Sequence, residues 1–274
     1  MQRLLRRSAH TNITKILRKT HQADVAQIMR NLNQYDQNTI FSLCPTALHK
    51  ARLLEELDEA LIEKVLENES SKTISKIFRY LDTNDQATII SMFSEDKQNE
   101  ILKIIEVDDK EEVEEIMSYP DDSAGSIMTK ETFTLDQNTS VKDSIKKLQS
   151  FPENDKIFYL YVLDKKEKLV GVVSLRTLVT SKNSKKLKDI MIKDIQAATT
   201  DTDQEEVAKK VAQYNYLALP VVNRQNRFLG IVTIDDVVDI IREEASEDFL
   251  QMAGVGKDRE ILLKSPFENA QSRA

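Results

Sequence analysis

The sequence predicts a two-part α plus α/β fold, in which an all-helical N-terminal region precedes two copies of a mixed unit of strands and helices. Three observations predict this fold. All five glycines lie at or after Gly125, so the first 124 residues lack the residue that tight hairpin turns favour. Apolar residues recur in those 124 residues at helical spacing. The remaining chain contains a duplicated segment.

The N-terminal region is expected to be a stack of short helices. Residues 25–32 and 74–81 each carry apolar side chains at positions i, i+3, i+4 and i+7, which is one face of a helix. Weaker stripes of the same kind follow up to residue 117. Short polar breaks such as 68–71 and 94–96 supply helix N-cap residues between the stripes. Short helices repeated in this way predict an α-solenoid, or superhelix.

The duplicated segment aligns without a gap, residues 160–179 against 219–238, and Gly171 matches Gly230. Each copy is typical of a strand, a polar turn, a second strand and the start of a helix. We name the two units the first repeat and the second repeat. Only the second repeat runs on into a dense acidic segment, DDVVDIIREEASEDF from Asp235. This asymmetry points to the second repeat as the functional one.

The segment YPDDSAG, residues 119–125, marks the joint between the two parts. Its proline ends the preceding helix and its glycine permits a left-handed turn. A similar tetrapeptide introduces each repeat, IMTK at 127–130 and IMIK at 190–193. The predicted division is a helical domain at 1–124, the first repeat at 125–189, the second repeat at 190–243, and a connecting helix with a tail at 244–274.

Composition excludes several classes of protein. A net charge of −7, with cations clustered only at the N-terminus, argues against nucleic acid as a partner. The single cysteine, Cys44, excludes an internal disulfide, and three scattered histidines leave oxygen as the plentiful ligand atom. No P-loop, GxGxxG, HExxH or nucleophile-elbow motif occurs, so we expect no enzymatic activity.

The chain contains no apolar run of the roughly 20 residues that cross a bilayer and no signal peptide. It is therefore expected to be cytosolic in type. Six lysines and arginines interleave with apolar residues before position 20. This basic start fits an ordinary first helix with a solvated face, and contact with anionic lipid is the alternative.

The acidic segment places Asp236, Asp239, Glu243 and Glu247 at intervals of 3, 4 and 4 residues, which forms one carboxylate stripe on a helix. Like charges at this spacing repel, so a cation from another segment or a metal ion should compensate them. Carboxylates without histidine or thiolate suit Mg²⁺ or Ca²⁺. A solvated helix face remains the alternative interpretation.

Each repeat also has a hydroxyl residue just after its second strand, Ser174 with Thr177 three residues later and Thr233 with Asp236 three residues later. A hydroxyl and a carboxylate at a strand end entering a helix can hold a ribose. The same pair can also simply cap the helix.

With these residues in view, the two repeats resemble CBS domains paired in a Bateman module. The wider pattern resembles the cytosolic part of MgtE-type magnesium channels, most strongly over residues 119–254. This resemblance is carried by the segments YPDDSAGSIMTKE, TDTDQEEVA, LPVV, GIVTIDDVVDII and EEASEDFLQMAG. The resemblance implies a helical superhelix, a tandem CBS module and a C-terminal connecting, or plug, helix.

The resemblance further implies a homodimer formed through the CBS domains, with Mg²⁺ bound between the helical domain and the CBS pair and between the CBS region and the connecting helix. Asn215 and the helix start at Asn84 depart from the family pattern, which often has acids there. The matching metal-site residues are Asp85, Gly125 through its backbone oxygen, Asp203, Asp236, Asp239, Glu244, Glu247 and Asp248.

The same resemblance implies a nucleotide, ATP or AMP, in the CBS cleft. Tyr159, Arg176 and Tyr216 match contacting positions, and Thr233 joins them from the hydroxyl–carboxylate pair. Thr177 stands where the first repeat would often have Asp, which departs from the pattern. The two tyrosines fit core or dimer-interface aromatics equally well.

The hypothesis is a cytosolic Mg²⁺ sensor that gates a magnesium channel by closing its acidic domain interfaces. It would lie on the cytoplasmic side of the plasma membrane, joined to a pore domain of the same full-length protein. This chain is then expected to be a fragment of that protein, and a natural soluble paralogue is the alternative. The second hypothesis is an adenine-nucleotide-responsive CBS adaptor whose helical stack docks a protein partner.

Overall fold

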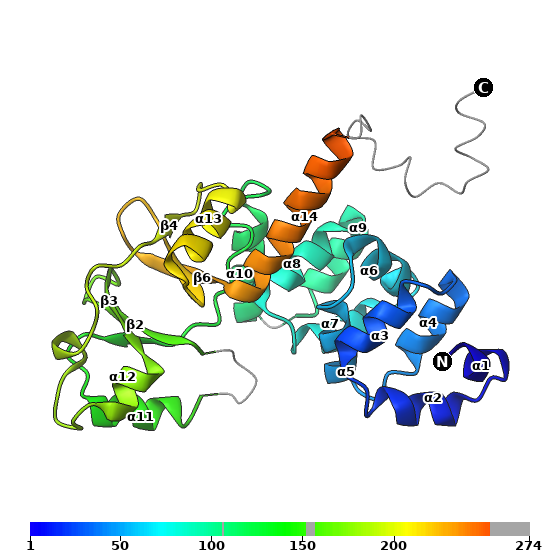
Figure 1. Cartoon of the computed structure of the whole chain (residues 1–274), viewed down its shortest axis with the longest axis horizontal. Helices are drawn as coiled ribbons and strands as arrows, with labels where there is room; N and C mark the ends of the chain where they lie inside the picture. The colour runs from blue at the N-terminus through cyan, green and yellow to red at the C-terminus, as the bar shows by residue number, and fades with distance from the viewer. Residues whose placement is uncertain (106, 152–156, 253–274) are drawn as a thin grey trace.

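A computed structural model describes residues 1–105, 107–151 and 157–252, and within them the side chains of 107–109, 243 and 246–252 are excepted. The helical domain and the two mixed repeats lie side by side (Figure 1). The last helix, α14 (Ile234–Met252), starts next to α8 (Thr83–Ser91) of the helical domain and extends upward from there. The predicted fold class, a helical region followed by two mixed α/β units, is confirmed.

The helical domain is built from short helices, as the periodicity predicts. Asn33, Thr46, Asp58 and Ser70 each cap the following helix by accepting a hydrogen bond from a backbone amide three residues on. The helices are α1 (Gln2–Arg6), α2 (His10–Leu17), α3 (Gln22–Met29), α4 (Gln34–Ser42), α5 (Ala47–Leu54), α6 (Glu59–Leu66), α7 (Ser71–Phe78), α8, α9 (Glu95–Leu102) and α10 (Val107–Met117).

A recurring glutamine joins successive helices of this stack. Gln37, Gln86 and Gln98 each lie four residues after an N-cap, and their side-chain amides donate to carbonyl oxygens at the end of the preceding helix. Gln37 Nε2, for example, lies 3.0 Å from the carbonyl oxygen of Met29 and 2.9 Å from that of Leu32. These contacts satisfy carbonyls that a helix end leaves unpaired. They mark the helices as degenerate copies of one unit.

Each repeat forms a three-stranded sheet, with one parallel pair and one antiparallel hairpin. The sheets pack against each other through Tyr161, whose ring stacks on Phe228 at 5.0 Å between centroids. The first repeat contains β1 (Thr134–Asp136), α11 (Val141–Leu148), β2 (Tyr159–Leu163), β3 (Leu169–Ser174), α12 (Leu175–Thr180) and η1 (Leu187–Asp189). The second contains β4 (Ala198–Thr199), α13 (Gln204–Tyr214), β5 (Ala218–Val222), β6 (Phe228–Thr233) and α14.

The two introductory tetrapeptides are exchanged between the repeats. Thr129 pairs with Ile231 of the second repeat, while Ile192 pairs with Val172 of the first. A side chain at Gly230 would meet the Thr129 carbonyl oxygen at 2.5 Å, so this close approach requires glycine. Residues near the joint therefore share a hydrophobic core with the second repeat.

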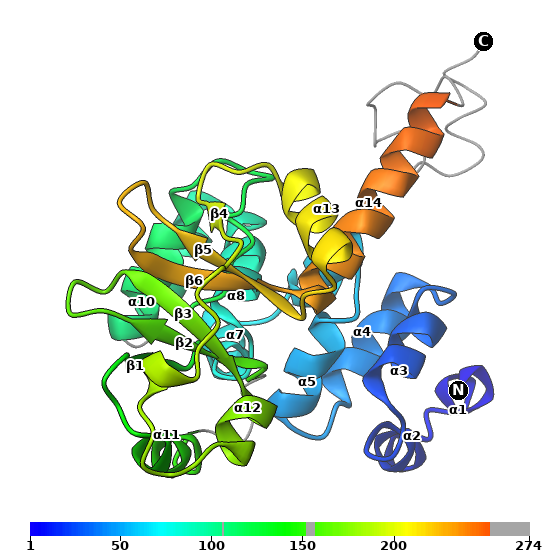
Figure 2. The same ribbon diagram turned by 60° about the vertical axis from the view of Figure 1, so that its left-hand side comes forward.

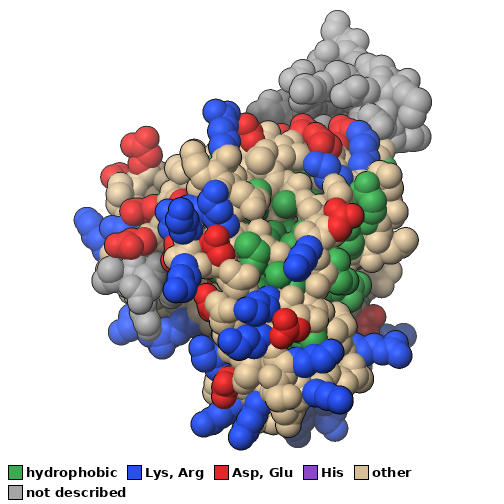
Figure 3. All heavy atoms as spheres, turned by 90° about the vertical axis from the view of Figure 1, so that its left-hand side faces the viewer, with side chains coloured by type: hydrophobic (Ala, Val, Ile, Leu, Met, Phe, Trp, Pro, Cys, Tyr) green, Lys and Arg blue, Asp and Glu red, His purple; other side chains and the backbone are tan. Residues whose placement is uncertain are grey.

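Charge is divided unevenly between the repeats. Residues 125–189 contain 13 Lys and Arg against 8 Asp and Glu, whereas residues 190–243 contain 6 against 9. Figure 3 shows the cations gathered at the lower end of one face, which is the end where α11 lies in Figure 1. The expectation that cations cluster only at the N-terminus is wrong, because the fold brings distant lysines together. The exposed lysines there are Lys142, Lys146, Lys147, Lys182, Lys185, Lys186 and Lys188.

Helix α14 is continuous over 19 residues, so the predicted boundary between 243 and 244 lies inside it. Val237 and Ile240 face the core, and α14 packs beside α13, as Figure 2 shows. Within the described residues, no helix combines the length and apolar character needed to cross a membrane.

Candidate functional site

The first turn of α14 meets the first turn of α8 at the boundary between the helical domain and the second repeat. Asp236 Oδ2 accepts hydrogen bonds from the backbone nitrogen of Thr233 at 3.0 Å and from its hydroxyl at 2.7 Å. Its other oxygen, Oδ1, accepts from Asn84 Nδ2 at 3.2 Å. Asp236 is half-buried there. One carboxylate of the predicted stripe therefore faces the helical domain rather than solvent.

A second carboxylate from the repeat side reaches the same helix end. Glu131 Oε1 accepts from the Thr83 hydroxyl at 2.7 Å, and Oε2 accepts from the Thr83 backbone nitrogen at 3.4 Å. The Thr129 hydroxyl also donates to Glu131. Neither Thr83 nor Glu131 is among the site residues predicted from the sequence. The one available signal was the acid that closes the segment YPDDSAGSIMTKE.

Oxygen atoms suited to a hard cation gather at this contact. Asn84 is only 7% exposed, and its Oδ1 is buried without a hydrogen-bond partner. Asp85, the predicted ligand from the helical side, follows it and is half-buried. Amide and carboxylate oxygens are ligands that Mg²⁺ and Ca²⁺ accept. Within the described residues no three His, Cys, Asp or Glu side chains form a group that could hold a metal ion, so the arrangement offers a partial ligand set.

A second acidic group lies between the start of α13 and the middle of α14. Asp203 caps α13 by accepting from the Glu205 backbone nitrogen at 2.9 Å, and Gln204 Nε2 donates to Glu244 Oε1 at 3.1 Å. The hydrogen bond from Lys209 lowers the pKa of Glu205, and a contact with Glu244 acts in the same direction. The structure thus brings the predicted residues Asp203 and Glu244 into one neighbourhood.

The remaining predicted ligands on α14 differ in their surroundings. Asp239 is exposed and accepts a hydrogen bond from Arg242 Nη1 at 3.0 Å, so the cation required next to the stripe is supplied in part by its own helix. The side chains of Glu247 and Asp248 lie outside the described residues.

Gly125 is buried at the joint. Its nitrogen donates to the Thr200 carbonyl oxygen at 3.0 Å, and a side chain at this position would meet the Tyr119 ring at 2.5 Å. The Tyr119 hydroxyl donates to Glu115 at 2.8 Å, and Lys130 pairs with the same carboxylate. Burial, together with Glu115, raises the pKa of Tyr119 to about 12. These contacts join residues 119–130 to the second repeat and to α10.

Two of the four predicted nucleotide residues are neighbours. The Tyr159 hydroxyl lies 3.5 Å from the backbone nitrogen of Leu217, next to Tyr216, and burial raises the pKa of Tyr216 with a smaller contribution from Tyr159. Thr233 is buried at the domain boundary, where its hydroxyl donates to the half-buried Asp236. The next residue, Ile234, donates its backbone N–H to the carbonyl oxygen of Leu217 at 2.9 Å. Arg176 is exposed on α12.

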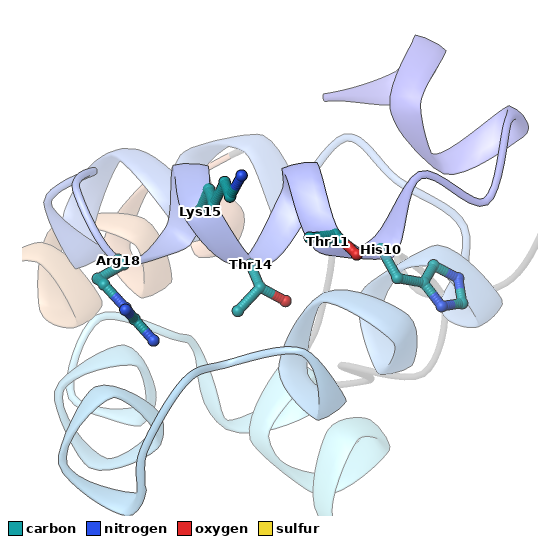
Figure 4. Close-up of a pocket in the computed structure, with 5 residues that line it drawn as sticks. All are labelled: His10, Thr11, Thr14, Lys15 and Arg18. Carbon is teal, nitrogen blue, oxygen red and sulfur yellow. The ribbon is translucent and has the colours of Figure 1, made fainter.

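Two hollows lie elsewhere, at the N-terminal end of the helical domain. The first, of about 410 Å³, is lined by five residues on or next to α2, among which Thr14 and Arg18 point toward the neighbouring helices (Figure 4). The second lies between residues 18–22 and 48–56. Neither contains a predicted site residue.

Comparison with known proteins agrees with this architecture. The model of the MgtE intracellular N domain matches residues 20–122, and the CBS domain model matches 124–183 and 187–243. The crystal structure of the cytosolic domain of the Mg²⁺ channel MgtE in complex with ATP superposes with a TM-score of 0.81 at 28% identity, covering 87% of this chain and 98% of that one. The chain is homologous to the MgtE cytosolic domain. The predicted resemblance is thereby confirmed.

MgtE proteins also appear among the similar sequences. The magnesium transporter MgtE of Bacillus subtilis is 41% identical over 158 residues, which is 57% of this chain and 35% of the relative. That of Thermus thermophilus is 39% identical over 145 residues, 53% of this chain and 32% of the relative. The chain thus aligns with about a third of the length of these relatives. These relatives are named as a magnesium transporter and a Mg²⁺ channel, which agrees with the expectation that this chain is not an enzyme.

Proposed function

We propose that this chain is the cytosolic Mg²⁺-sensing region of an MgtE-type magnesium channel, in which Mg²⁺ draws the helical domain and the second repeat together. The observation that carries the proposal is the meeting of Asp236 with Asn84 across the domain boundary, 3.2 Å apart. Residues 152 positions apart are joined there through a carboxylate of the acidic stripe. Homology to the MgtE cytosolic domain supports the same function.

The residues at the boundary fit Mg²⁺ chemically. The orphaned Oδ1 of Asn84 and the carboxylates of Asp85 and Asp236 would hold an ion between the domains. Asp203 and Glu244, with Gly125, Asp239, Glu247 and Asp248, are the further proposed ligands. When bound, the ion supplies positive charge that relieves the repulsion between carboxylates. Oxygen ligands with replaceable waters suit weak affinity for an abundant cytosolic ion.

Helix α14 would transmit the change. It begins next to Asp236 at the domain boundary and continues without a break to Met252, so displacement of its first turn moves its far end. At low Mg²⁺ the carboxylates repel and the domains separate, and at higher Mg²⁺ the closed state is populated. Mg²⁺ shifts this equilibrium because it binds the closed state better. The partner acted upon is the membrane pore domain of the same full-length protein.

A homodimer formed through the repeats belongs to the proposal. Large apolar side chains of the two repeats are exposed in the single chain, and a second copy of the chain would cover them. They include Val179 at 66%, Tyr214 at 43%, Leu217 at 46%, Val238 at 38% and Ile241 at 47% exposed.

An adenine nucleotide, ATP or AMP, is the second proposed ligand. The homologous MgtE cytosolic domain was crystallised with ATP. Here the adjacent Tyr159 and Tyr216 would contact the base, with Arg176 and Thr233 as further contacts. In the first repeat Thr177 offers a hydroxyl that already bonds the Ser174 hydroxyl at 2.9 Å. This set also supports the second candidate function, a nucleotide-responsive adaptor.

Calorimetry and small-angle scattering of the full chain test the proposal. Millimolar Mg²⁺ should release or absorb heat and compact the protein, and Asp236→Asn combined with Glu247→Gln should abolish both effects. The matched control combines Asp24→Asn with Glu63→Gln, two exposed acids of the helical domain, and should behave as the unaltered chain. Tight binding of AMP or ATP without any response to Mg²⁺ would instead favour the adaptor.

A further inference from the structure

The N-terminus of α8 is capped from the other domain. Asp82, its N-cap residue, makes no capping bond with its own side chain. Glu131 instead receives both the backbone N–H and the hydroxyl of Thr83, 48 residues away. A helix N-terminus carries partial positive charge and unpaired N–H groups, so a carboxylate there is stabilising. This contact exists only while the helical domain lies against the repeats.

The position of Glu131 is fixed by the second repeat. Thr129, two residues earlier, forms a pair of backbone hydrogen bonds with Ile231 of β6, at 2.8 Å and 3.0 Å. The Thr129 hydroxyl also donates to the Glu131 carboxylate. Because β6 leads directly into α14, Glu131 and Asp236 are both positioned against α8 by the end of β6. Glu131 is therefore ready to receive α8 before the domains meet.

Burial shows that the contact is a packed one. Thr83 is only 2% exposed and Asn84 is 7% exposed, although both begin a helix, where residues are commonly solvated. Separation of the domains would return the Thr83 hydroxyl and amide to water. Hydrogen bonds to an ionised acceptor are stronger than neutral ones. Their loss therefore opposes separation.

We propose that Glu131 is a docking residue that holds the helical domain against the second repeat without any cation. This inference rests on the proposed function for the existence of an open state. Asp236 and Asp85 bring like charges to the boundary, which repel until Mg²⁺ arrives, although Asp236 also accepts a hydrogen bond from Asn84. Both carboxylate oxygens of Glu131, in contrast, already have donors on Thr83. Repulsion between carboxylates and the hydrogen bonds to Glu131 then act in opposite directions at one boundary. The strength of the Glu131 contact sets how much Mg²⁺ is needed to close that boundary.

The test measures the ratio of closed to open molecules by the distance between two spin labels, in EDTA and across a Mg²⁺ titration of the full chain. Glu131→Gln keeps the size of the side chain and removes its charge. It should lower the closed-to-open ratio in EDTA by about tenfold. It should also raise the Mg²⁺ concentration at which half of the molecules are closed, because more Mg²⁺ is then needed for closure. Glu111→Gln, an exposed acid on α10, removes the same charge and should change neither quantity.

Thr83→Val provides the second arm, because it removes one of the two donors and leaves the backbone N–H. It should lower the closed-to-open ratio less than Glu131→Gln does, and the double variant should lower it by less than the two effects combined. A thermal unfolding curve for each variant excludes loss of folding as the cause. Equal closed-to-open ratios for Glu131→Gln and Glu111→Gln in EDTA, or fully additive effects of the pair, would overturn the proposal.

The two proposals fail in different ways. If Mg²⁺ changes neither the compactness nor the label distance of the unaltered chain, the sensor function fails, while an effect of Glu131→Gln in EDTA would still support docking. If Mg²⁺ closes the chain but Glu131→Gln matches its control in EDTA, docking by Glu131 is wrong and the sensor function stands.

Discussion

The two repeats have the same fold and matching glycines, yet they differ at the end of their last strand. In the first repeat, the Ser174 hydroxyl pairs with the Thr177 hydroxyl at 2.9 Å and α12 ends after six residues. In the second, the Thr233 hydroxyl donates to the Asp236 carboxylate at 2.7 Å and α14 runs for 19 residues. The same local cap is thus neutral in one repeat and charged in the other.

The two repeats also differ in the charge of the residues that lie around them. The second repeat presents its carboxylate to the start of α8, while the first repeat gathers exposed lysines on α11 and near η1. The exchanged tetrapeptides add to the difference, since residues 127–130 bring Lys130 and the adjacent Glu131 to the second repeat. A duplicated scaffold therefore becomes specialised through what packs beside it, with few changes in its own core.

The largest expected effect is on the free energy of unfolding, and it should differ between the two matched glycines. Gly230→Ala forces a methyl group against the Thr129 backbone oxygen, which cannot move without breaking its pairing with β6. Gly171→Ala meets the Met191 side chain instead, at Sδ and, at 2.8 Å, at Cβ, so Met191 must take another rotamer and shift slightly. Gly230→Ala should lower the free energy of unfolding by about 3 kcal/mol and Gly171→Ala by about 1 kcal/mol. Urea denaturation measures both, and equal losses would show that the tetrapeptide exchange does not constrain the repeats differently.

A reciprocal exchange tests the charged cap. Asp236→Thr gives the second repeat the residue of the first and removes the acceptor of Asn84 Nδ2, which should weaken docking of α8 by about 2 kcal/mol. Thr177→Asp has no partner domain beside it and should change stability by less than about 0.5 kcal/mol. Hydrogen exchange of the α8 amides measures the first effect. Unchanged protection in Asp236→Thr would contradict the role given to this carboxylate.

The lysines of the two tetrapeptides should respond differently to pH. Burial acts to raise the pKa of Glu115, but hydrogen bonds from Lys130 and Tyr119 outweigh it and hold the pKa below its ordinary value of 4.5. Because the folded pKa is the lower one, the stabilisation is present above pH 4.5 and is lost as the pH falls below it. Lys130→Met should remove about 1 kcal/mol at pH 7 and flatten this pH dependence. Lys193→Met, on the exposed counterpart, should leave the unfolding profile between pH 3 and 7 unchanged.

The smallest effect concerns the lysines of the first repeat. None of the seven forms an ion pair within the described part of the chain, so Lys185→Gln should relieve repulsion and raise stability by a few tenths of a kcal/mol at low salt. Lys209 of the second repeat pairs with Glu205 at 2.7 Å, so Lys209→Gln should change stability in the opposite direction and lower it at low salt. Melting temperatures with and without 1 M salt test the pair. A gain that persists in high salt would rule out charge repulsion as its cause.

Local patterns predicted most of the fold. Val25, Met29, Ile74 and Phe78 repeat with helical spacing and are buried, and Val141–Leu148 forms the predicted helix α11. Such features depend on residues within a few positions of one another, which a single sequence displays. The matched glycines revealed the duplication for the same reason.

Contacts between residues far apart in the chain could not be predicted from the sequence. Glu131 meets Thr83 and Asp236 meets Asn84 only because the tetrapeptide of the first repeat lies on the second and α8 docks beside it. The lysine cluster joins residues from 142 to 188 that are separated by two strands. Of the predicted metal residues, those at the boundary were found by resemblance and by spacing. Their partners on the helical side required the structure.

The distance between the helical domain and the first repeat tests the central claim most directly. Spin labels at Tyr35→Cys and Lys146→Cys, two exposed positions, report it, while buried Cys44 escapes labelling. Dilution with unlabelled chain suppresses distances between protomers. Mg²⁺ at millimolar concentration should narrow the distribution to one distance, EDTA should broaden it, and Asp236→Asn with Glu247→Gln should keep it broad in Mg²⁺. A distribution that Mg²⁺ leaves unchanged would contradict cation-driven closure.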